Sequence, residues 1–293
     1  MRTLTNYTIG CLLLALVLSF GGFRFASTRS YHREIPYSGE HALKVTLSAG
    51  FGDLSVSRGK PDALLVADIN TEKDADIGNV IDYVHHGDIG YLTVNTSSDG
   101  SSKKHSIEFT GFNSNNLDLK FTEMIPISFE FGLGLGKGDL DLTGLNVKDL
   151  KISAGASSVR LAFDKPNKGT IEDLTIESGL SKFEGENLCN ANFNRLKFEG
   201  GVGSYSLDFG GTLNKEVDAN IEVGFGSLVV TVPANIGVKV LPEKNWMSHI
   251  DMDRDLSEQE SDTYYSPNYR SAQGKINMHI EVGLGSVKIR HSN

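Results

Sequence analysis

The chain has 293 residues, 39% of them hydrophobic, which is enough to bury a core in one or two domains. A formal net charge of −9, with no Lys/Arg cluster interleaved with aromatic residues, excludes a nucleic-acid partner, because such partners need a basic face. Glycine is abundant, at 32 residues, but has no triplet period, so the composition excludes collagen and predicts many tight corners.

The first 26 residues differ in kind from the rest. Arg2 precedes an uncharged run from Ile9 to Phe23, a length typical of the apolar part of a signal peptide and short for a membrane span. We expect residues 1–26 to be a signal peptide or an N-terminal membrane anchor. The chain would then be exported to the periplasm or the outer cell surface, tethered by residues 9–26 if they are retained. Membrane contact is expected only through this segment.

Residues 27–40 are polar and predict a spacer, and residues 41–128 predict an N-terminal β region. Leu43, Val45 and Leu47 alternate with polar residues there, which is the period of a half-buried strand.

A glycine corner followed by alternating apolar residues recurs along the chain. Degraded copies begin at Gly155, Gly179 and Gly201, and the leading glycines from 136 to 224 are spaced by 19, 24, 22 and 23 residues. Such a spacing is typical of stacked repeats, each too small to bury its own apolar face. The clear copies are Gly50-Phe-Gly-Asp-Leu-Ser-Val56, Gly136-Lys-Gly-Asp-Leu-Asp-Leu142, Gly224-Phe-Gly-Ser-Leu-Val-Val230 and Gly283-Leu-Gly-Ser-Val-Lys-Ile289.

This pattern predicts an all-β fold, a β-solenoid: a parallel β-helix-like stack of ~22-residue coils over residues 129–293, following the N-terminal strand region. Phe183, Leu188, Phe193 and Phe198 lie five residues apart, as in pentapeptide-repeat proteins, and predict coils with roughly four five-residue sides. A leucine-rich repeat and a two-sheet antiparallel sandwich are the competing folds.

The array is interrupted by a long insertion at 241–274. Repeat proteins often place binding residues on insertions, and aromatic side chains anchor contacts well. A cap that covers the edge of the last coil is the alternative interpretation. The candidate partner-binding residues are Trp246, Tyr264, Tyr265 and Tyr269.

No catalytic set, cofactor motif or metal set is expected. In the insertion, Asp251, Asp253, Asp255 and Asp262 match four positions of an EF-hand loop, but Leu256 stands where that loop needs glycine. We therefore expect a solvated acidic loop. If the leader is removed, Cys189 is the only remaining thiol, which predicts a buried structural cysteine and no intramolecular disulfide.

A polysaccharide-active solenoid enzyme would need carboxylates that converge on one face. We expect the positions that match Asp139 in later coils to hold Ser158, Ser204, Ser227 and Ser286. On this alignment, the acids around Asp139 do not recur. The sequence therefore favours a surface on which acids do not stack from coil to coil, and a protein that is not an enzyme.

Several segments carry a family resemblance. The run Gly138-Asp-Leu-Asp-Leu-Thr-Gly-Leu145, the segments 150–155 and 264–269, and the closing Glu281-Val-Gly-Leu-Gly-Ser-Val287 resemble the toast-rack family of bacterial envelope proteins. That family includes the C-terminal domain of membrane regulators of the cell-wall-antibiotic response and is similar to adhesin-type β-helix domains. Over roughly residues 41–291, the resemblance implies a β-solenoid outside the cytoplasmic membrane, with no catalytic residues to carry over.

The resulting functional expectation is a non-catalytic, adhesin-like interaction or structural module of the cell envelope, without a cofactor. Its partner would be an unknown protein or an envelope glycan. Two alternatives stay open: a modulator of envelope-stress signalling in the response to cell-wall antibiotics, and a polysaccharide-active β-helix enzyme.

Overall fold

A computed structural model describes residues 28–72, 80–96, 116–243 and 247–291. The expected leader and Trp246 lie outside these residues. The described chain is almost entirely strand, with one 3-10 turn, and none of its helices is long and apolar enough to cross a membrane. Its elements are β1 (Thr28–Pro36), β2 (Ala42–Arg58), β3 (Ala63–Glu72), β4 (Ile81–His86), β5 (Ile89–Asn95), β6 (Asn116–Phe121), β7 (Ile127–Asp141), β8 (Val147–Ala162), β9 (Ile171–Glu186), η2 (Leu188–Ala191), β10 (Phe193–Asp208), β11 (Glu216–Val232), β12 (Gly237–Glu243), β13 (Ser248–Met252), β14 (Ser257–Glu260), β15 (Thr263–Tyr265) and β16 (Lys275–His291).

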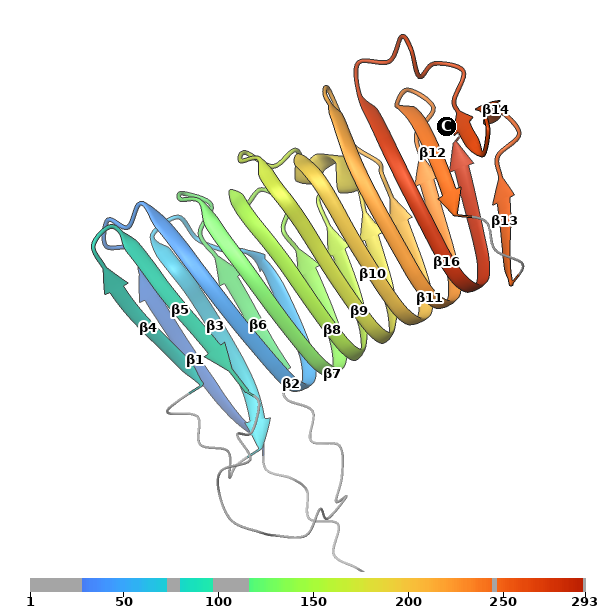
Figure 1. Cartoon of the computed structure of the whole chain (residues 1–293). Helices are drawn as coiled ribbons and strands as arrows, with labels where there is room; N and C mark the ends of the chain where they lie inside the picture. The colour runs from blue at the N-terminus through green and yellow to red at the C-terminus, as the bar shows by residue number, and fades with distance from the viewer. Residues whose placement is uncertain (1–27, 73–79, 97–115, 244–246, 292–293) are drawn as a thin grey trace, which may run out of the picture.

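Seven long strands form the body of the molecule and confirm the β-solenoid. Strands β2, β7, β8, β9, β10, β11 and β16 are 15–17 residues each and pair in parallel in that order. Figure 1 shows each of them bending at the lower edge of the stack and rising again. Each rung is therefore one bent strand plus a connection at the opposite edge, and the expected coil of four five-residue sides is wrong.

The stack extends further toward both ends than the sequence indicated. Strand β2 pairs in register with β7, so the regular array starts at residue 42 and not at 129. Strands β5 and β6 pair with the first and second halves of β2, and β12 and β13 pair with the two halves of β16. The terminal rungs are thus each made of two short strands.

The insertion expected at 241–274 is part of this terminal structure. It begins within β12 and contains β13, while β15 pairs antiparallel with β12 and with β14. The segment therefore covers the edge of β16, as the cap interpretation requires. The last strand of the chain lies between β11 and this cap.

The expected spacer at 27–40 is also wrong, because its residues 28–36 form β1. This strand pairs antiparallel with β3 along its whole length. Ile35 is buried and Tyr31 packs against the core, while the residues between them are polar. Two apolar residues in nine are a weak strand signal, and ladder hydrogen bonds to β3 supply what the pattern lacks.

The core consists of rows of apolar side chains, one from each rung. One such row runs from β2 to β16, and all of its members are buried because alternate residues of each strand point inward. Burying each of these side chains contributes roughly 1.5–3 kcal/mol. The row is Leu47, Phe131, Ile152, Ile176, Phe198, Ile221 and Ile280.

Glycine occupies one position of the bend in five of the seven long strands, and Ser157 and Ser181 occupy it in the other two. Gly226 has φ +140°, and a Cβ added there would lie 1.9 Å from the carbonyl oxygen of Gly203 on the neighbouring rung. No side chain fits at that separation. The rungs can stack at the normal strand spacing at this position only because it is glycine.

Buried asparagines bridge the rungs at the edge opposite the bends. The Asn167 side-chain amide donates to the carbonyl oxygens of Val147 and Ala191, at 2.8 and 3.2 Å, and its Oδ1 accepts from the backbone N–H of Val147 at 2.9 Å. Asn190 bridges Phe163 and Thr212 in the same way. These amides satisfy backbone groups that the ladders leave unpaired.

Candidate binding surface

The predicted tyrosines lie in the cap. The rings of Tyr265 and Tyr269 meet edge to face with centroids 5.2 Å apart, and Tyr264 packs against the core. The Tyr269 hydroxyl donates to Asn277 Oδ1 of β16 at 2.7 Å, and Lys239 Nζ lies 5.8 Å from the Tyr265 ring centroid. The three tyrosines are half-buried. Their contacts attach the cap to the last rung, and their role in partner binding stays a prediction.

The acidic run of the insertion is not a solvated loop. Asp251 pairs with Arg290 of β16 at 2.6 Å, which holds the pKa of this aspartate below its ordinary value, mainly through the hydrogen bond. Asp255 Oδ2 lies 2.5 Å from Nδ1 of the buried His291, and Asp253 accepts the His291 backbone N–H at 3.1 Å. Three of the four acids that resembled a calcium loop thus fasten the cap to the C-terminal strand, and Asp262 is exposed in the turn between β14 and β15.

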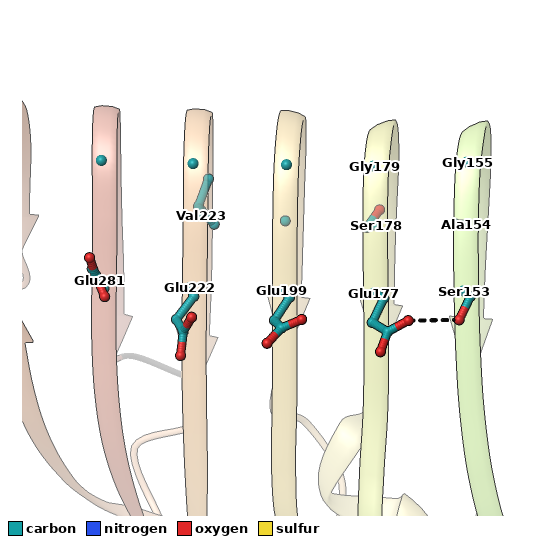
Figure 2. A pocket seen from close by; sticks show the side chains of 14 residues that line it. Ser153, Ala154, Gly155, Glu177, Ser178, Gly179, Glu199, Glu222, Val223 and Glu281 are labelled. Carbon is teal, nitrogen blue, oxygen red and sulfur yellow. Dashed lines mark hydrogen bonds between the residues drawn. The ribbon is translucent and has the colours of Figure 1, made fainter.

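The most regular polar feature is a row of glutamates on the outer face of four consecutive rungs. Glu177, Glu199, Glu222 and Glu281 are direct lateral neighbours in the ladders, and Ser153 occupies the same position on β8. Figure 2 shows these side chains at nearly the same height on adjacent strands. We call these four residues the glutamate row. Neighbouring members are separated by about 4.8 Å along the stack.

Each of the first three glutamates accepts from a neighbouring polar group. Glu177 accepts from Ser153 Oγ at 2.9 Å, Glu222 accepts from Asn220 Nδ2 at 2.7 Å, and Glu199 pairs with Lys197.

The carboxylates of the glutamate row change the pKa of Lys197. The pKa of Lys197 is raised, first by its hydrogen bond and ion pair with Glu199, and also by the charges of Glu222 and Glu177. The lysine thus feels carboxylates of three rungs at once. Charges on adjacent rungs thus add at this lysine, and Lys151 Nζ, 3.7 Å from Glu177, is a second cation beside the row.

A hollow of about 700 Å³ lies beside the glutamate row, between it and the bends. Its floor is a column of glycines, one per rung, which leave the backbone uncovered. A Cβ at Gly201 would lie 2.7 Å from the carbonyl oxygen of Gly179, so close stacking forbids larger residues at this point. The glycines that line the hollow in successive rungs are Gly155, Gly179, Gly201, Gly224 and Gly283.

Sequence reasoning missed this surface, and its expectation that acids do not stack is wrong. Ser158, Ser204, Ser227 and Ser286 do share a row, but it is the row of Lys137 and not of Asp139. The signal was present as a Glu-x-Gly triplet before four of the corners. It occurs at 177–179, 199–201, 222–224 and 281–283.

The remaining reactive groups are structural within the described chain. Burial, with a smaller effect of Asp208, raises the pKa of the Cys189 thiol to about 12, and Cys189 is a free, buried cysteine as expected. Among the described residues, no group of three or more His, Cys, Asp or Glu side chains is arranged to hold a metal ion.

A parallel stack of bent strands with in-register rows defines the chain as a β-solenoid of the toast-rack type. The sequence profile of the N-terminal domain of toast_rack, DUF2154, matches residues 24–184, more than half of the chain. The chain therefore belongs to this family.

Solved structures with a similar chain course are known. A putative cell adhesion protein from Clostridium sporogenes ATCC 15579 is 20% identical with a TM-score of 0.45, and 90% of this chain covers 100% of that one. A putative adhesin from Bacteroides fragilis NCTC 9343 is 15% identical with a TM-score of 0.38, at 90% and 98% coverage. A putative lipid binding protein from Parabacteroides distasonis ATCC 8503 is 10% identical with a TM-score of 0.29, at 89% and 96% coverage. No curated protein matches the chain.

Proposed function

We propose that the chain is an exported, non-catalytic interaction module of the cell envelope that binds an extended envelope glycan in the hollow along the glutamate row. The observation that carries the proposal is the repetition of one chemical group at one position on four consecutive rungs. A surface that repeats itself along an axis suits a partner that also repeats, because each added rung adds an equivalent contact. The toast-rack resemblance implies a domain outside the cytoplasmic membrane, which supports an exported chain.

The charge of the row selects the kind of glycan. Four carboxylates in line favour a polymer that carries amino groups, such as a glycan with free amino sugars, over a neutral or acidic polymer. The glycine floor carries no side chains, so a polymer can lie flat against it in the hollow. Binding by the row should weaken as salt rises, since its glutamates are partly exposed.

The same arrangement favours binding over catalysis. Cleavage of a glycosidic bond uses two carboxyl groups whose environments push their pKa values apart, one acting as acid and one as base or nucleophile. The glutamate row instead repeats one group at one ladder position, with neighbouring members about 4.8 Å apart along a single line. Its members are therefore suited to holding charge and not to dividing acid and base roles between them.

The test is binding of glucosamine oligomers and of N-acetylglucosamine oligomers of equal length to the full-length chain, measured by titration calorimetry without lipid. We expect affinity for the amino form only, lost in the Glu199→Gln, Glu222→Gln double variant. The matched control is Glu260→Gln, an exposed glutamate on β14 outside the hollow, which should bind as the parent does. Equal binding by all three proteins, or no binding of either oligomer, would contradict the proposal. Release of new reducing ends would instead support the enzyme alternative.

A further inference from the structure

Exposed apolar side chains form a line along the bends. The residue after the first corner glycine of each rung points outward, and six of these residues are 40–65% exposed. They are lateral neighbours from β2 to β8 and again from β9 to β16. Ala156 on β8 is level with Leu180 on β9, because Ala154 and Ser158 on either side of it pair with Ser178 and Lys182. We call this line the bend ridge, which consists of Phe51, Leu135, Ala156, Leu180, Val202, Phe225 and Leu284.

The bend ridge is too regular to be incidental surface. Half of the twelve large hydrophobic side chains exposed in the described chain lie in this one row. Seven rungs at about 4.8 Å give a continuous apolar line about 29 Å long. Single exposed apolar residues are normal on protein surfaces, whereas contiguous ones mark a contact with a partner or a membrane.

The ladders show where the chain enters relative to the ridge. Ser30 pairs with Asn70, Asn70 pairs with Asn116, and Asn116 pairs with Asp53, the residue directly after the corner glycine of β2. Because β1 and β2 run in the same direction, Thr28 is level with the residue two before Asp53. That residue is Phe51, the first member of the bend ridge.

The sequence before Thr28 limits how far the uncharged N-terminal run can lie from the bend edge. The uncharged run Ile9–Phe23 ends five residues before Thr28, and five residues span at most about 17 Å of extended chain. If the run is retained in a bilayer, the bend edge is held within that distance of the membrane surface.

We propose that the bend ridge docks on a lipid bilayer, its side chains entering the region between headgroups and acyl chains. Such insertion requires an apolar line that reaches only about 5–10 Å into the interface, with polar groups on either side. The glutamate row flanks the ridge on one side, and the row of Lys137, Lys182 and Ser204 flanks it on the other. The hollow then opens sideways just above the membrane.

A second copy of the chain fits this surface less well. The ridge is one side chain wide, with glycine before each of its residues and glycine or serine after it. Two facing ridges would therefore bury much less than the roughly 800 Å² per partner of a stable interface. Two copies would also bring their glutamate rows close together. A fluid bilayer has neither restriction, and the acids favour zwitterionic over anionic lipid.

Depth-dependent fluorescence on the full-length chain tests the proposal. Cys11→Ser leaves the buried Cys189 as the only native thiol, and Leu180→Cys then carries an NBD dye on the ridge. The chain is reconstituted in phosphatidylcholine vesicles with and without doxyl groups on the acyl chains. We expect blue-shifted emission that the doxyl groups quench.

The matched control carries the dye at Lys165→Cys, an exposed position between β8 and β9 at the opposite edge, where neither effect is expected. Adding Val202→Glu to the Leu180→Cys protein should reduce the quenching, while adding Glu260→Gln should not. Unquenched emission at both dye positions overturns the proposal. A blue shift without doxyl quenching overturns it too, because it indicates a protein partner such as a second copy. The glycan test uses no lipid, so failures of the two proposals are distinguishable.

Discussion

Replacing Gly226 by alanine should destabilise the stack severely, because two separate costs meet at this residue. Its φ of +140° is a conformation that costs a non-glycine residue about 1–3 kcal/mol. A Cβ would also lie 1.9 Å from the Gly203 carbonyl oxygen, so β10 and β11 must separate locally. Loss of two ladder hydrogen bonds at about 1 kcal/mol each brings the expected total to about 3–5 kcal/mol.

Two matched variants separate these costs. Gly39 has φ +104° with no atom within 4 Å of an added Cβ, so Gly39→Ala pays the conformational cost alone, about 1–3 kcal/mol. Gly132 is within β7, and its nearest atom would be 3.6 Å away, so Gly132→Ala should change stability by less than about 1 kcal/mol. Guanidinium denaturation followed by circular dichroism gives the ranking. A Gly226→Ala protein no less stable than Gly39→Ala would refute the contact argument.

Two further predictions concern buried polar groups. Burial alone would raise the pKa of Glu40, but hydrogen bonds from Ser38 and Tyr83 lower it from 4.5 to about 2, so its contribution is present above pH 4.5 and is lost as pH falls toward 2. Acid denaturation should show this loss, about 3 kcal/mol, and Glu40→Gln should remove it; an unchanged pH profile would contradict the assignment. Asn167→Leu leaves the Val147 N–H and carbonyl groups without their side-chain partner and should cost about 2–4 kcal/mol, measured by thermal unfolding. A loss below 1 kcal/mol would show that water replaces the amide.

Glycine spacing and alternation were enough to predict the solenoid. Both are local properties, and the close approach of the rungs at Gly226 admits only glycine at that residue. The boundaries of the regular array were harder to predict, because they depend on pairing with strands far away in the chain. Strand β2 belongs to the regular array only because β7, more than 80 residues later, pairs with it. Strand β16 lies between β11 and β12 although β12 comes first in the chain.

The candidate surface was hidden for a different reason. A row across rungs is found only if the repeats are aligned to the exact residue. The sequence alignment was wrong by two residues, so it placed Asp139 in the row of serines and concealed the recurrence of Glu177 and its neighbours. Anchoring the alignment on the glycine before the bend, and not on the most glycine-rich corner, recovers the Glu-x-Gly triplets. The acids Asp251 and Asp255 look like loop residues in sequence because Arg290 and His291, their partners, lie in the last strand.

Disulfide trapping between neighbouring rungs tests the central claim, that the bent strands stack in register, most directly. Ser204 and Ser227 are lateral neighbours with their Oγ atoms 3.2 Å apart, and Ser286 is one rung further. In a Cys11→Ser background, Ser204→Cys with Ser227→Cys should form an intramolecular disulfide on mild oxidation. Ser204→Cys with Ser286→Cys skips a rung, about 9.6 Å, and should stay reduced, because a disulfide needs Cα atoms within about 7 Å. A disulfide in the skipped pair, or none in the adjacent pair, would contradict the account.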